Sequence, residues 1–282
     1  MNESFLVFTR PVDRTGFFYA QDYKRDFMSD QWTRFQLNLG VWQGSFTTFD
    51  QQLQLQHVQP SELTLSLAPS GSSIELALLF WPKQDSVSIA SQSGDPVKRI
   101  GQHFSSLQPE LCFFPTGSFC RGSLFIAPVP QVWSRPFAEF GFLFQDRRHR
   151  LVLLWDGSGR LDRIVLIREF RAGCNVEERP AFEPEMLSGE WLLEETNRIS
   201  GHGEDHSNVI RRGMTVEAED LDGLIALPDG GAIRAPKTLG DQKGLDIEAW
   251  WCAGSDRIER IVRRYDLYGS WVGADHQLWT RA

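Results

Sequence analysis

The sequence predicts an all-β protein built from two consecutive antiparallel β-barrels, each preceded by a short helix. Three observations support this prediction. Apolar and polar residues alternate along many short segments that Gly and Pro separate, a Gly-x-Trp motif follows a short amphipathic stretch twice, and the charge balance changes near Gly173. Alternation with a period of two is typical of antiparallel sheets with one buried face. Many short strands with frequent turn residues favour a sandwich or a barrel.

The first elements follow from local patterns. Residues 29–39, "SDQWTRFQLNL", carry apolar side chains at helical spacing, Ser29 or Asp30 can cap this helix, and Gly40 ends it. Strands follow, and the clearest alternation lies in 62–67, 74–80, 137–145 and the two arms of a hairpin, 151–155 and 161–170, whose turn is 156–159. Further strands are expected at 190–197, 208–218, 223–227, 231–235, 245–252, 257–266 and 275–281.

The repeated Gly-x-Trp motif sets the domain organisation. Trp42 and Trp191 lie 149 residues apart, a period that indicates a duplicated domain rather than a solenoid. The expected units are therefore a first barrel at 28–172, a Pro- and Glu-containing linker at 173–186, and a second, short or partly open barrel at 187–282.

The first 27 residues have no clean period. We expect residues 1–27 to be an N-terminal extension that is disordered, or to precede a true translation start at Met28. The alternative is an arm that packs on the first barrel through its phenylalanines.

The composition excludes several classes of function. The net charge is −8, which argues against a nucleic-acid partner because phosphate binding needs a basic surface. The charge is uneven, at +1 for residues 1–173 and −9 for residues 174–282. No apolar run reaches the roughly 20 residues of a membrane span. We expect no secretory signal, because the N-terminal residues lack a basic region followed by an apolar one. The four cysteines are scattered without a CxxC pair, which favours reduced thiols in the cytoplasm and leaves disulfides open.

These motifs resemble the lipocalins and the wider calycin superfamily. The stretches "LGVWQGSFTTF" (39–49) and "DGSGRLDRIVLIREFR" (156–171) resemble a two-barrel, lipocalin-like family of unknown function from oxygenic phototrophs such as cyanobacteria. The second half, through "LSGEWLLEETNRI" (187–199) and residues 256–282, is similar to the S-type phycobiliprotein lyases, which are single lipocalin-like barrels that deliver bilins. A shared barrel does not by itself imply shared chemistry.

The resemblance gives the tryptophans a structural role. In lipocalins the Gly-x-Trp side chain closes one end of the barrel, and a basic residue from the last strand lies over its ring, a contact worth roughly 0.5–2 kcal/mol. The expected partners are Arg168 or Arg171 for Trp42, and Arg281 for Trp191.

One basic strand inside the acidic second half is the candidate ligand site. Four arginines fall within residues 257–264, close in sequence to several aromatic residues. Guanidinium groups can pair with the carboxylates of a planar ligand such as a bilin, and tryptophans can stack on its rings. The proposed site residues are Arg260, Arg263, Arg264, Tyr265, Trp250 and Trp279. The competing interpretation is an exposed strand edge of alternating Glu and Arg above a tryptophan core.

Other groups of polar and titratable residues have simpler explanations than a catalytic or metal site. His202 and His206 flank Asp205 at a metal-like spacing, but neighbouring glycines favour a solvated loop, so no metal site is expected. Ser118 and Ser123 lack a nucleophile-elbow motif, and Cys120 beside Arg121 fits a buried strand cysteine. The acidic pairs Glu194–Glu195 and Glu217–Glu219 fit the surface of an acidic barrel, and no catalytic residue is proposed.

Three hypotheses for function remain. The first is a binding protein for a hydrophobic or tetrapyrrole ligand, acting as a carrier or assembly factor. The second is an enzyme that resembles a bilin lyase, with a phycobiliprotein as partner. The third is an interaction protein whose barrels are filled by side chains. A barrel of about eight strands is just wide enough for side chains or one small ligand, and a cavity of about 300 Å³ or more would favour the first two hypotheses.

Overall fold

The computed structural model describes residues 31–85, 92, 94–126, 135–174, 177–201, 204–216, 218–240 and 244–282. The expected N-terminal extension, the proposed caps Ser29 and Asp30, and the loop residue His202 lie outside these ranges. Residues 31–36 are helical, within the expected helix 29–39, and Gly40 begins the first strand. Among the described residues, no helix is long and apolar enough to cross a membrane.

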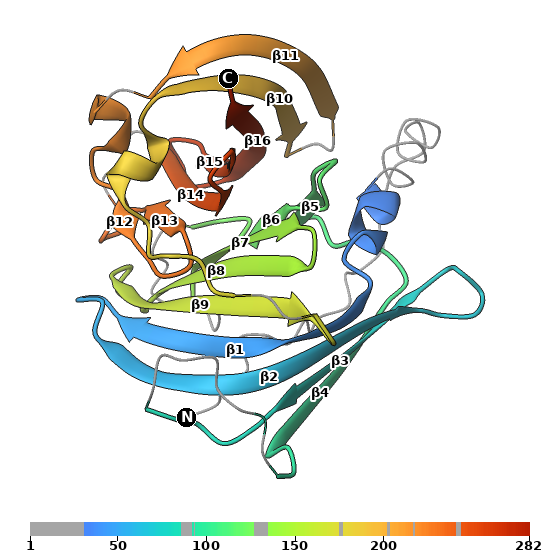
Figure 1. The fold of residues 1–282 in the computed structure, drawn as a ribbon. Coiled ribbons are helices and arrows are strands. Elements are labelled where there is room, and N and C mark those ends of the chain that lie inside the picture. The colour runs from blue at the N-terminus through green and yellow to red at the C-terminus, as the bar shows by residue number, and fades with distance from the viewer. Residues whose placement is uncertain are drawn as a thin grey trace.

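The fold is almost entirely antiparallel β-sheet, as the alternation predicts (Figure 1). The first sheet contains β1 (Gly40–Asp50), β2 (Leu55–Leu67), β3 (Ile74–Phe80), β4 (Lys98–Phe104), β5 (Leu111–Phe113), β6 (Phe119–Gly122), β7 (Phe137–Phe144), β8 (Arg147–Trp155) and β9 (Leu161–Arg171). The second contains β10 (Glu190–Ser200), β11 (Asp205–Thr215), β12 (Ile225–Ala226), β13 (Gly231–Arg234), β14 (Leu245–Gly254), β15 (Arg257–Tyr265) and β16 (Trp271–Arg281). The short 3₁₀ helices are η2 (Pro184–Leu187), which precedes the second sheet, and η3 (Ala218–Leu221).

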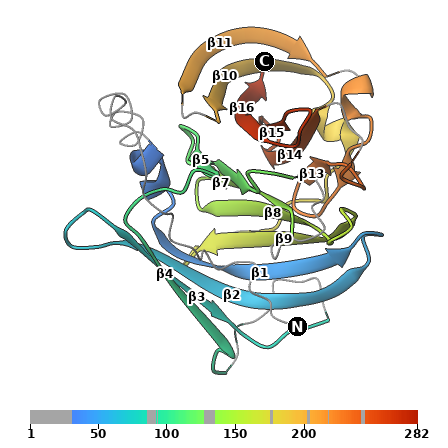
Figure 2. The ribbon, with the colours of Figure 1, turned by 180° about the vertical axis from the view of Figure 1, so that it is seen from behind.

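Each sheet is an up-and-down barrel with one seam left open. The order of the first sheet is β4-β3-β2-β1-β9-β8-β7-β6-β5, and that of the second is β11-β10-β16-β15-β14-β13-β12. The first strand of each sheet in the chain pairs with the last, β1 with β9 and β10 with β16. Strands that are consecutive in the chain also pair, except β4 with β5 and β11 with β12. We call the two sheets the first half-barrel and the second half-barrel. Both views show them curled, with β10 and β11 arching over β14–β16 (Figures 1 and 2).

The duplication extends beyond the tryptophans. Arg171 and Arg281 end the last strands of the two half-barrels, pair in register with Trp42 and Trp191, and lie 110 residues apart. The tryptophans are 149 residues apart, so the segment from Trp42 to Arg171 is 39 residues longer than the segment from Trp191 to Arg281. The hairpin β3–β4 has no counterpart among the described strands of the second half-barrel, and it accounts for most of this difference.

The middle strands of the first half-barrel are buried on both faces. Every residue of β8 is buried, because its inner face lines the first half-barrel and its outer face packs against the second. Leu151, Leu153 and Trp155 belong to a core shared by both sheets, whereas Val152 and Leu154 belong to the core inside the first half-barrel. In Figure 1 these middle strands lie between β1–β4 and the second half-barrel.

Charged contacts across the shared core explain part of the uneven charge. Asp229 of the second half-barrel pairs with Arg147 and with His149 Nδ1 at 3.1 Å. The buried Glu259 Oε2 accepts a hydrogen bond from Ser118 Oγ at 2.6 Å. Carboxylates of the acidic second half therefore neutralise or bond groups of the first half, and the two sheets form one packed unit.

The connecting segment 173–186 makes more contacts than its composition indicates. Glu178 pairs with Arg168 at 2.6 Å, Arg179 N donates to Asp229 Oδ1 at 2.8 Å, and Phe182 is buried in the core of the second half-barrel. The expected linker therefore packs on both half-barrels, through Glu178, its backbone and one aromatic side chain.

Candidate functional site

Each half-barrel contains a tryptophan under a late-strand arginine. The guanidinium carbon of Arg171 lies 4.4 Å from the ring centroid of Trp42, and that of Arg281 lies 4.2 Å from the ring of Trp191. Both rings are fully buried. Each indole Nε1 donates to the carbonyl four residues earlier, at 2.9 Å in both cases. Each arginine also bonds the carbonyl three residues before its tryptophan.

The glycines of the motif make room for these arginines. Gly40 has a φ of 133° and Gly189 a φ of 102°, both in a region that L side chains rarely adopt. A Cβ on Gly189 would lie 2.6 Å from Arg281 Nη1, and a Cβ on Gly40 would collide with Arg171 Nη1. The motif is therefore required by the backbone turn and by the close approach of the guanidinium.

Arg168, the alternative partner for Trp42, lies elsewhere. Its guanidinium pairs with Glu178 and donates to Thr47 Oγ1 at 2.9 Å. Arg168 and Arg171 are three positions apart on β9, so their side chains point to opposite faces of the strand.

The six residues of the proposed ligand site are divided between the two faces of β15. Arg260 lies over Trp250 at 4.9 Å, and Trp250 packs edge-on against Trp279. Arg263 and Tyr265 lie on the opposite face, buried against the first half-barrel, where Arg263 Nε donates to Tyr265 Oη at 2.9 Å. The structure therefore does not bring the six residues together.

The arginines on the Trp250 face of β15 are already paired with carboxylates. Arg260 Nε donates to Glu248 Oε2 at 2.6 Å, and Arg264 pairs with Asp246 and Asp275. Arg257 points to the first half-barrel, where it stacks on Phe144 and pairs with Glu259 at 2.7 Å. The basic strand thus forms ion pairs on both of its faces.

Two hollows lie inside the first half-barrel instead. One, of about 70 Å³, is lined mainly by apolar residues of β2–β6 and by charged residues of β6–β8. The second, of about 110 Å³, lies further along the same strands, beside Phe46, Phe80, Val152 and Ile167. Sequence reasoning missed this site because its large apolar side chains look like those of any barrel core.

The charged wall of the first hollow is a buried cluster on the inner face of β6–β9. Arg150 donates to Glu169 through Nε at 3.1 Å and Nη2 at 3.0 Å, and to Glu139 through Nη1 at 3.2 Å. Arg121 lies 3.6 Å from Glu139, and Arg148 lies 3.5 Å from Glu169. The available signal was "RRHRLVLLW" (147–155), in which strand alternation places two arginines on one face with Val152 and Leu154.

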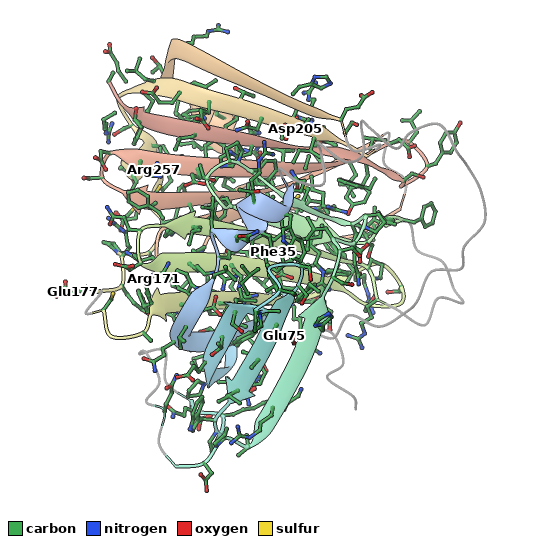
Figure 3. The ribbon with its side chains drawn as sticks, turned by 90° about the vertical axis from the view of Figure 1, so that its right-hand side faces the viewer. Phe35, Glu75, Arg171, Glu177, Asp205 and Arg257 are labelled. Atoms are coloured by element: carbon green, nitrogen blue, oxygen red, sulfur yellow. The ribbon has the colours of Figure 1, made fainter. Side chains whose placement is uncertain are left out.

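The helix covers the open seam of the first half-barrel at this end. Phe35 stacks on Phe113 of β5 at 4.8 Å and meets Phe104 of β4 edge-on at 5.4 Å. Gln31 accepts from Phe113 N and donates to Phe113 O. Figure 3 shows Phe35 on the helix beside the strands of the first half-barrel. Phe35 therefore bridges the two strands that do not pair with each other.

A third, open hollow of about 340 Å³ lies where the half-barrels meet. Arg171 and Arg257 line it, one from each half-barrel, on the same side of the molecule (Figure 3). Both arginines have carboxylate partners, Asp146 at 2.9 Å and Glu259 at 2.7 Å. Its mouth is wider than those of the first two hollows and its lining is mixed, so it is less suited to hold a ligand firmly.

The remaining candidates occupy structural positions. Ser118 donates to Glu259, and Ser123 Oγ accepts from Phe137 N at 3.1 Å. His206 lies 3.9 Å from Glu204, while Asp205 pairs with Arg34. No group of three metal-ligating side chains occurs within the described part of the chain, to which His202 and Glu217 do not belong.

The cysteines are unpaired. Cys112 and Cys120 face each other across β5 and β6 with their sulfurs 3.4 Å apart, and no cysteine forms a disulfide. Burial opposes ionisation of Cys120, but the hydrogen bond with Cys112 and the charge of Arg263 lower its pKa. This pair lies in the shared core, away from the two hollows.

The fold and its plugged, half-open barrels define a duplicated antiparallel β-barrel protein. Residues 28–174, more than half of the chain, match the model of the family described as domain of unknown function DUF3598, N-terminal, and the chain belongs to this family. Residues 200–277 match a second model, described as the C-terminal domain of biogenesis factor required for ATP synthase 1. A search of the curated proteins found no match.

A solved structure of the same family supports the fold. A DUF3598 protein of unknown function from Nostoc punctiforme PCC 73102 is 27% identical, covers 89% of this chain and 99% of its own, and superposes with a TM-score of 0.69. An S-type phycobiliprotein lyase from Guillardia theta is 10% identical, with 93% and 98% coverage and a TM-score of 0.18. A putative outer membrane protein from Bacteroides fragilis NCTC 9343 is 11% identical, with 88% and 99% coverage and a TM-score of 0.26. The last two superpositions are too weak to carry an argument about function.

Proposed function

We propose that this protein binds a small, mainly apolar ligand inside the first half-barrel and acts as a carrier or assembly factor. The supporting observation is the pair of hollows of about 70 and 110 Å³ within an otherwise closely packed core. Sites for drug-sized ligands measure about 300–1,000 Å³. The two hollows therefore suit a slender hydrocarbon chain better than a flat tetrapyrrole.

A tetrapyrrole in the second half-barrel has less support. Arg260 and Arg264, the two candidate arginines on the Trp250 face of the sheet, are each paired with a carboxylate. A bilin propionate would have to displace Glu248 or Asp275, and the displaced buried acid would keep only its second arginine, Arg234 or Arg198, which costs free energy.

A role in assembly is the second candidate. The match of residues 200–277 to the C-terminal domain of a biogenesis factor supports it. In this case the second half-barrel would contact a protein partner, and the first would be filled by its own side chains. Ligand binding separates the two proposals.

The test uses N-phenyl-1-naphthylamine, a neutral fluorescent probe of apolar sites. The full chain should bind it in the micromolar range, and Leu78→Trp should weaken binding at least tenfold by filling the first hollow. Ala77→Trp is the matched control, because Ala77 is the exposed neighbour on the same strand and points to the opposite face. Circular dichroism would verify that both variants fold. No binding to the wild-type chain at high micromolar probe would reject the ligand-binding proposal.

A further inference from the structure

Two buried cysteines face each other at the end of the first sheet. Cys112 of β5 and Cys120 of β6 pair directly in register, and their sulfurs are 3.4 Å apart. Directly opposite residues of an antiparallel pair have Cα atoms about 4.5–5.5 Å apart, within the range of about 4.4–6.8 Å that a disulfide requires. Because an S–S bond measures about 2.05 Å, a small movement of the two side chains would bring the sulfurs to bonding distance.

The two thiols differ in how readily they ionise. The side-chain hydrogen bond with Cys120 raises the pKa of Cys112 well above its ordinary value, and burial adds to this effect. Burial also opposes ionisation of Cys120, but the hydrogen bond with Cys112 and the charge of Arg263 lower the pKa of Cys120 overall. Cys120 is therefore the thiol that can lose its proton, and Cys112 is the one that keeps it.

An arginine of the second half-barrel lies beside the Cys120 sulfur. Arg263 of β15 is fully buried, and its Nη1 lies 3.8 Å from Cys120 Sγ. The oxygens to which its guanidinium donates are neutral, namely the carbonyls of Glu110 and Gly122 and the hydroxyl of Tyr265. A thiolate on Cys120 would give this buried cation a negative neighbour. Since the thiolate is the nucleophilic form of cysteine, the arrangement favours reaction at Cys120.

We propose that Cys112 and Cys120 form a reversible disulfide on exposure to hydrogen peroxide, and that Cys120 reacts first. The Cys120 thiolate attacks one peroxide oxygen, the O–O bond breaks, and the departing hydroxide takes a proton to become water, which leaves a sulfenic acid on Cys120. The Cys112 thiol then attacks that sulfur, forming the S–S bond and releasing a second water. The two thiols lose two electrons and two protons, and the peroxide is reduced to two molecules of water.

The position of the pair indicates which oxidant can reach it and what the bond would do. Cys112 is 2% and Cys120 0% exposed, so a small neutral oxidant suits the site better than a bulky thiol reagent. The strand β5 is three residues long and ends the first sheet, where it pairs with β6. A disulfide would fasten this edge strand to its neighbour. The pair lies outside the two hollows, so the proposed disulfide is independent of ligand binding.

The experiment maps the disulfide by peptide mass spectrometry. Trypsin cleaves after Arg99 and Arg121, so both cysteines fall in one peptide, residues 100–121. The reduced full chain is treated with hydrogen peroxide, quenched with catalase, unfolded and alkylated with iodoacetamide. The peptide should then carry no alkyl group and be about 2 Da lighter than its reduced, unmodified form. Dithiothreitol before alkylation should restore two alkylated cysteines, as in protein that received no peroxide.

Two results would overturn the proposal. The first is a peptide with both cysteines alkylated after peroxide treatment. The second is oxidation of these cysteines to sulfinic or sulfonic acid without a disulfide, since dithiothreitol does not reverse those states.

Single cysteine variants test the order of events. Cys112→Ser should leave a sulfenic acid on Cys120 after peroxide treatment, which the cyclic diketone dimedone labels. Cys120→Ser should leave Cys112 unmodified under the same conditions. Labelling of Cys112 in the second variant, without labelling of Cys120 in the first, would show that the roles of the two thiols are reversed.

The charge of Arg263 is tested by the rate of disulfide formation. Arg263→Gln should slow it about tenfold, the effect of one pKa unit on the thiolate fraction. Arg264→Gln is the matched control, because Arg264 is the next residue on β15, points to the opposite face and pairs with Asp275. It should keep the wild-type rate, and equal slowing by both variants would contradict the role of Arg263. If Arg263→Gln does not fold, the wild-type peptide still decides whether the disulfide forms.

Discussion

Arg281 lies over Trp191 at 4.2 Å and reproduces, 110 residues later, the contact that Arg171 makes with Trp42 at 4.4 Å. The repeat includes the indole hydrogen bond to the carbonyl four residues earlier and the arginine bond to the carbonyl three residues earlier. Equivalent contacts in the two halves of the chain show that each half-barrel contains the same small unit.

The first prediction concerns this unit. Trp191→Ala should lower the free energy of unfolding by about 3–5 kcal/mol, because it removes a large buried aromatic side chain. Arg281→Ala should lower it by about 0.5–2 kcal/mol through loss of the cation–π contact. Denaturant titration followed by circular dichroism measures both changes. Arg281→Lys should fall between wild type and Arg281→Ala, and wild-type stability of Arg281→Ala would contradict the role assigned to this side chain.

The second prediction concerns Gly189. Gly189→Ala should destabilise the protein by about 1–3 kcal/mol, because the φ of 102° is strained for alanine and the new Cβ would approach Arg281 Nη1. The control is Gly213→Ala on β11, where an added Cβ meets no atom within 4 Å. Thermal unfolding of the two variants should separate them clearly, and equal melting temperatures would refute the argument.

The third prediction concerns cooperativity. Asp229 pairs with Arg147 and His149 across the shared core, so Asp229→Ala leaves two buried groups without their acid. The variant should lose about 3–5 kcal/mol of stability. Wild-type protein should unfold in one transition when followed by tryptophan fluorescence and by circular dichroism. Two separated transitions in wild type would mean that the half-barrels are independent.

The fourth prediction concerns pH. Burial lowers the pKa of His149 below its ordinary value of 6.5, against the opposing effect of Asp229. The unfolded chain therefore binds a proton on this residue at a higher pH than the native protein does. The stabilising contribution is present above pH 6.5 and is lost as the pH falls through 6.5 toward the native pKa.

His149→Gln tests this expectation. Between pH 7.5 and 5.5 its unfolding free energy should depend less steeply on pH than that of wild type, by at most about 1.4 kcal/mol per pH unit, the value for one proton. Identical slopes for wild type and His149→Gln would show that His149 is not held neutral in the folded protein.

The fifth prediction concerns the thiols. Cys174 is exposed, whereas Cys252 is buried and burial raises its pKa to about 12. Brief treatment of native protein with iodoacetamide should modify Cys174 first and leave Cys252 unmodified until the protein unfolds. Peptide mass spectrometry identifies the labelled residue, and early labelling of Cys252 would indicate that the second half-barrel opens.

The sequence alone determined the class of the fold, the approximate strands and the two plugs. Period-two alternation and Gly-x-Trp are local patterns, because a strand fixes the direction of alternate side chains and the glycine is needed at a turn. For this reason Trp42 and Trp191 could be named from the motif, and the resemblance to the lipocalins then supplied Arg281 and left Arg168 and Arg171 as alternatives. The choice between these two could not be made, since it depends on which face of β9 turns inward.

Only the tertiary structure decided what covers each face. Alternation separates Arg260 and Arg264 from Arg263 and Tyr265, but it does not say that the first half-barrel buries the second pair or that Glu248 and Asp275 neutralise the first. The charged cluster around Arg148 was missed for the same reason. Its five residues come from four strands, and only the pairing of those strands brings them together. The local sequence determines which residues of a strand share a face. The charge balance and the size of a site depend on the side chains that neighbouring strands and the other half-barrel place around it.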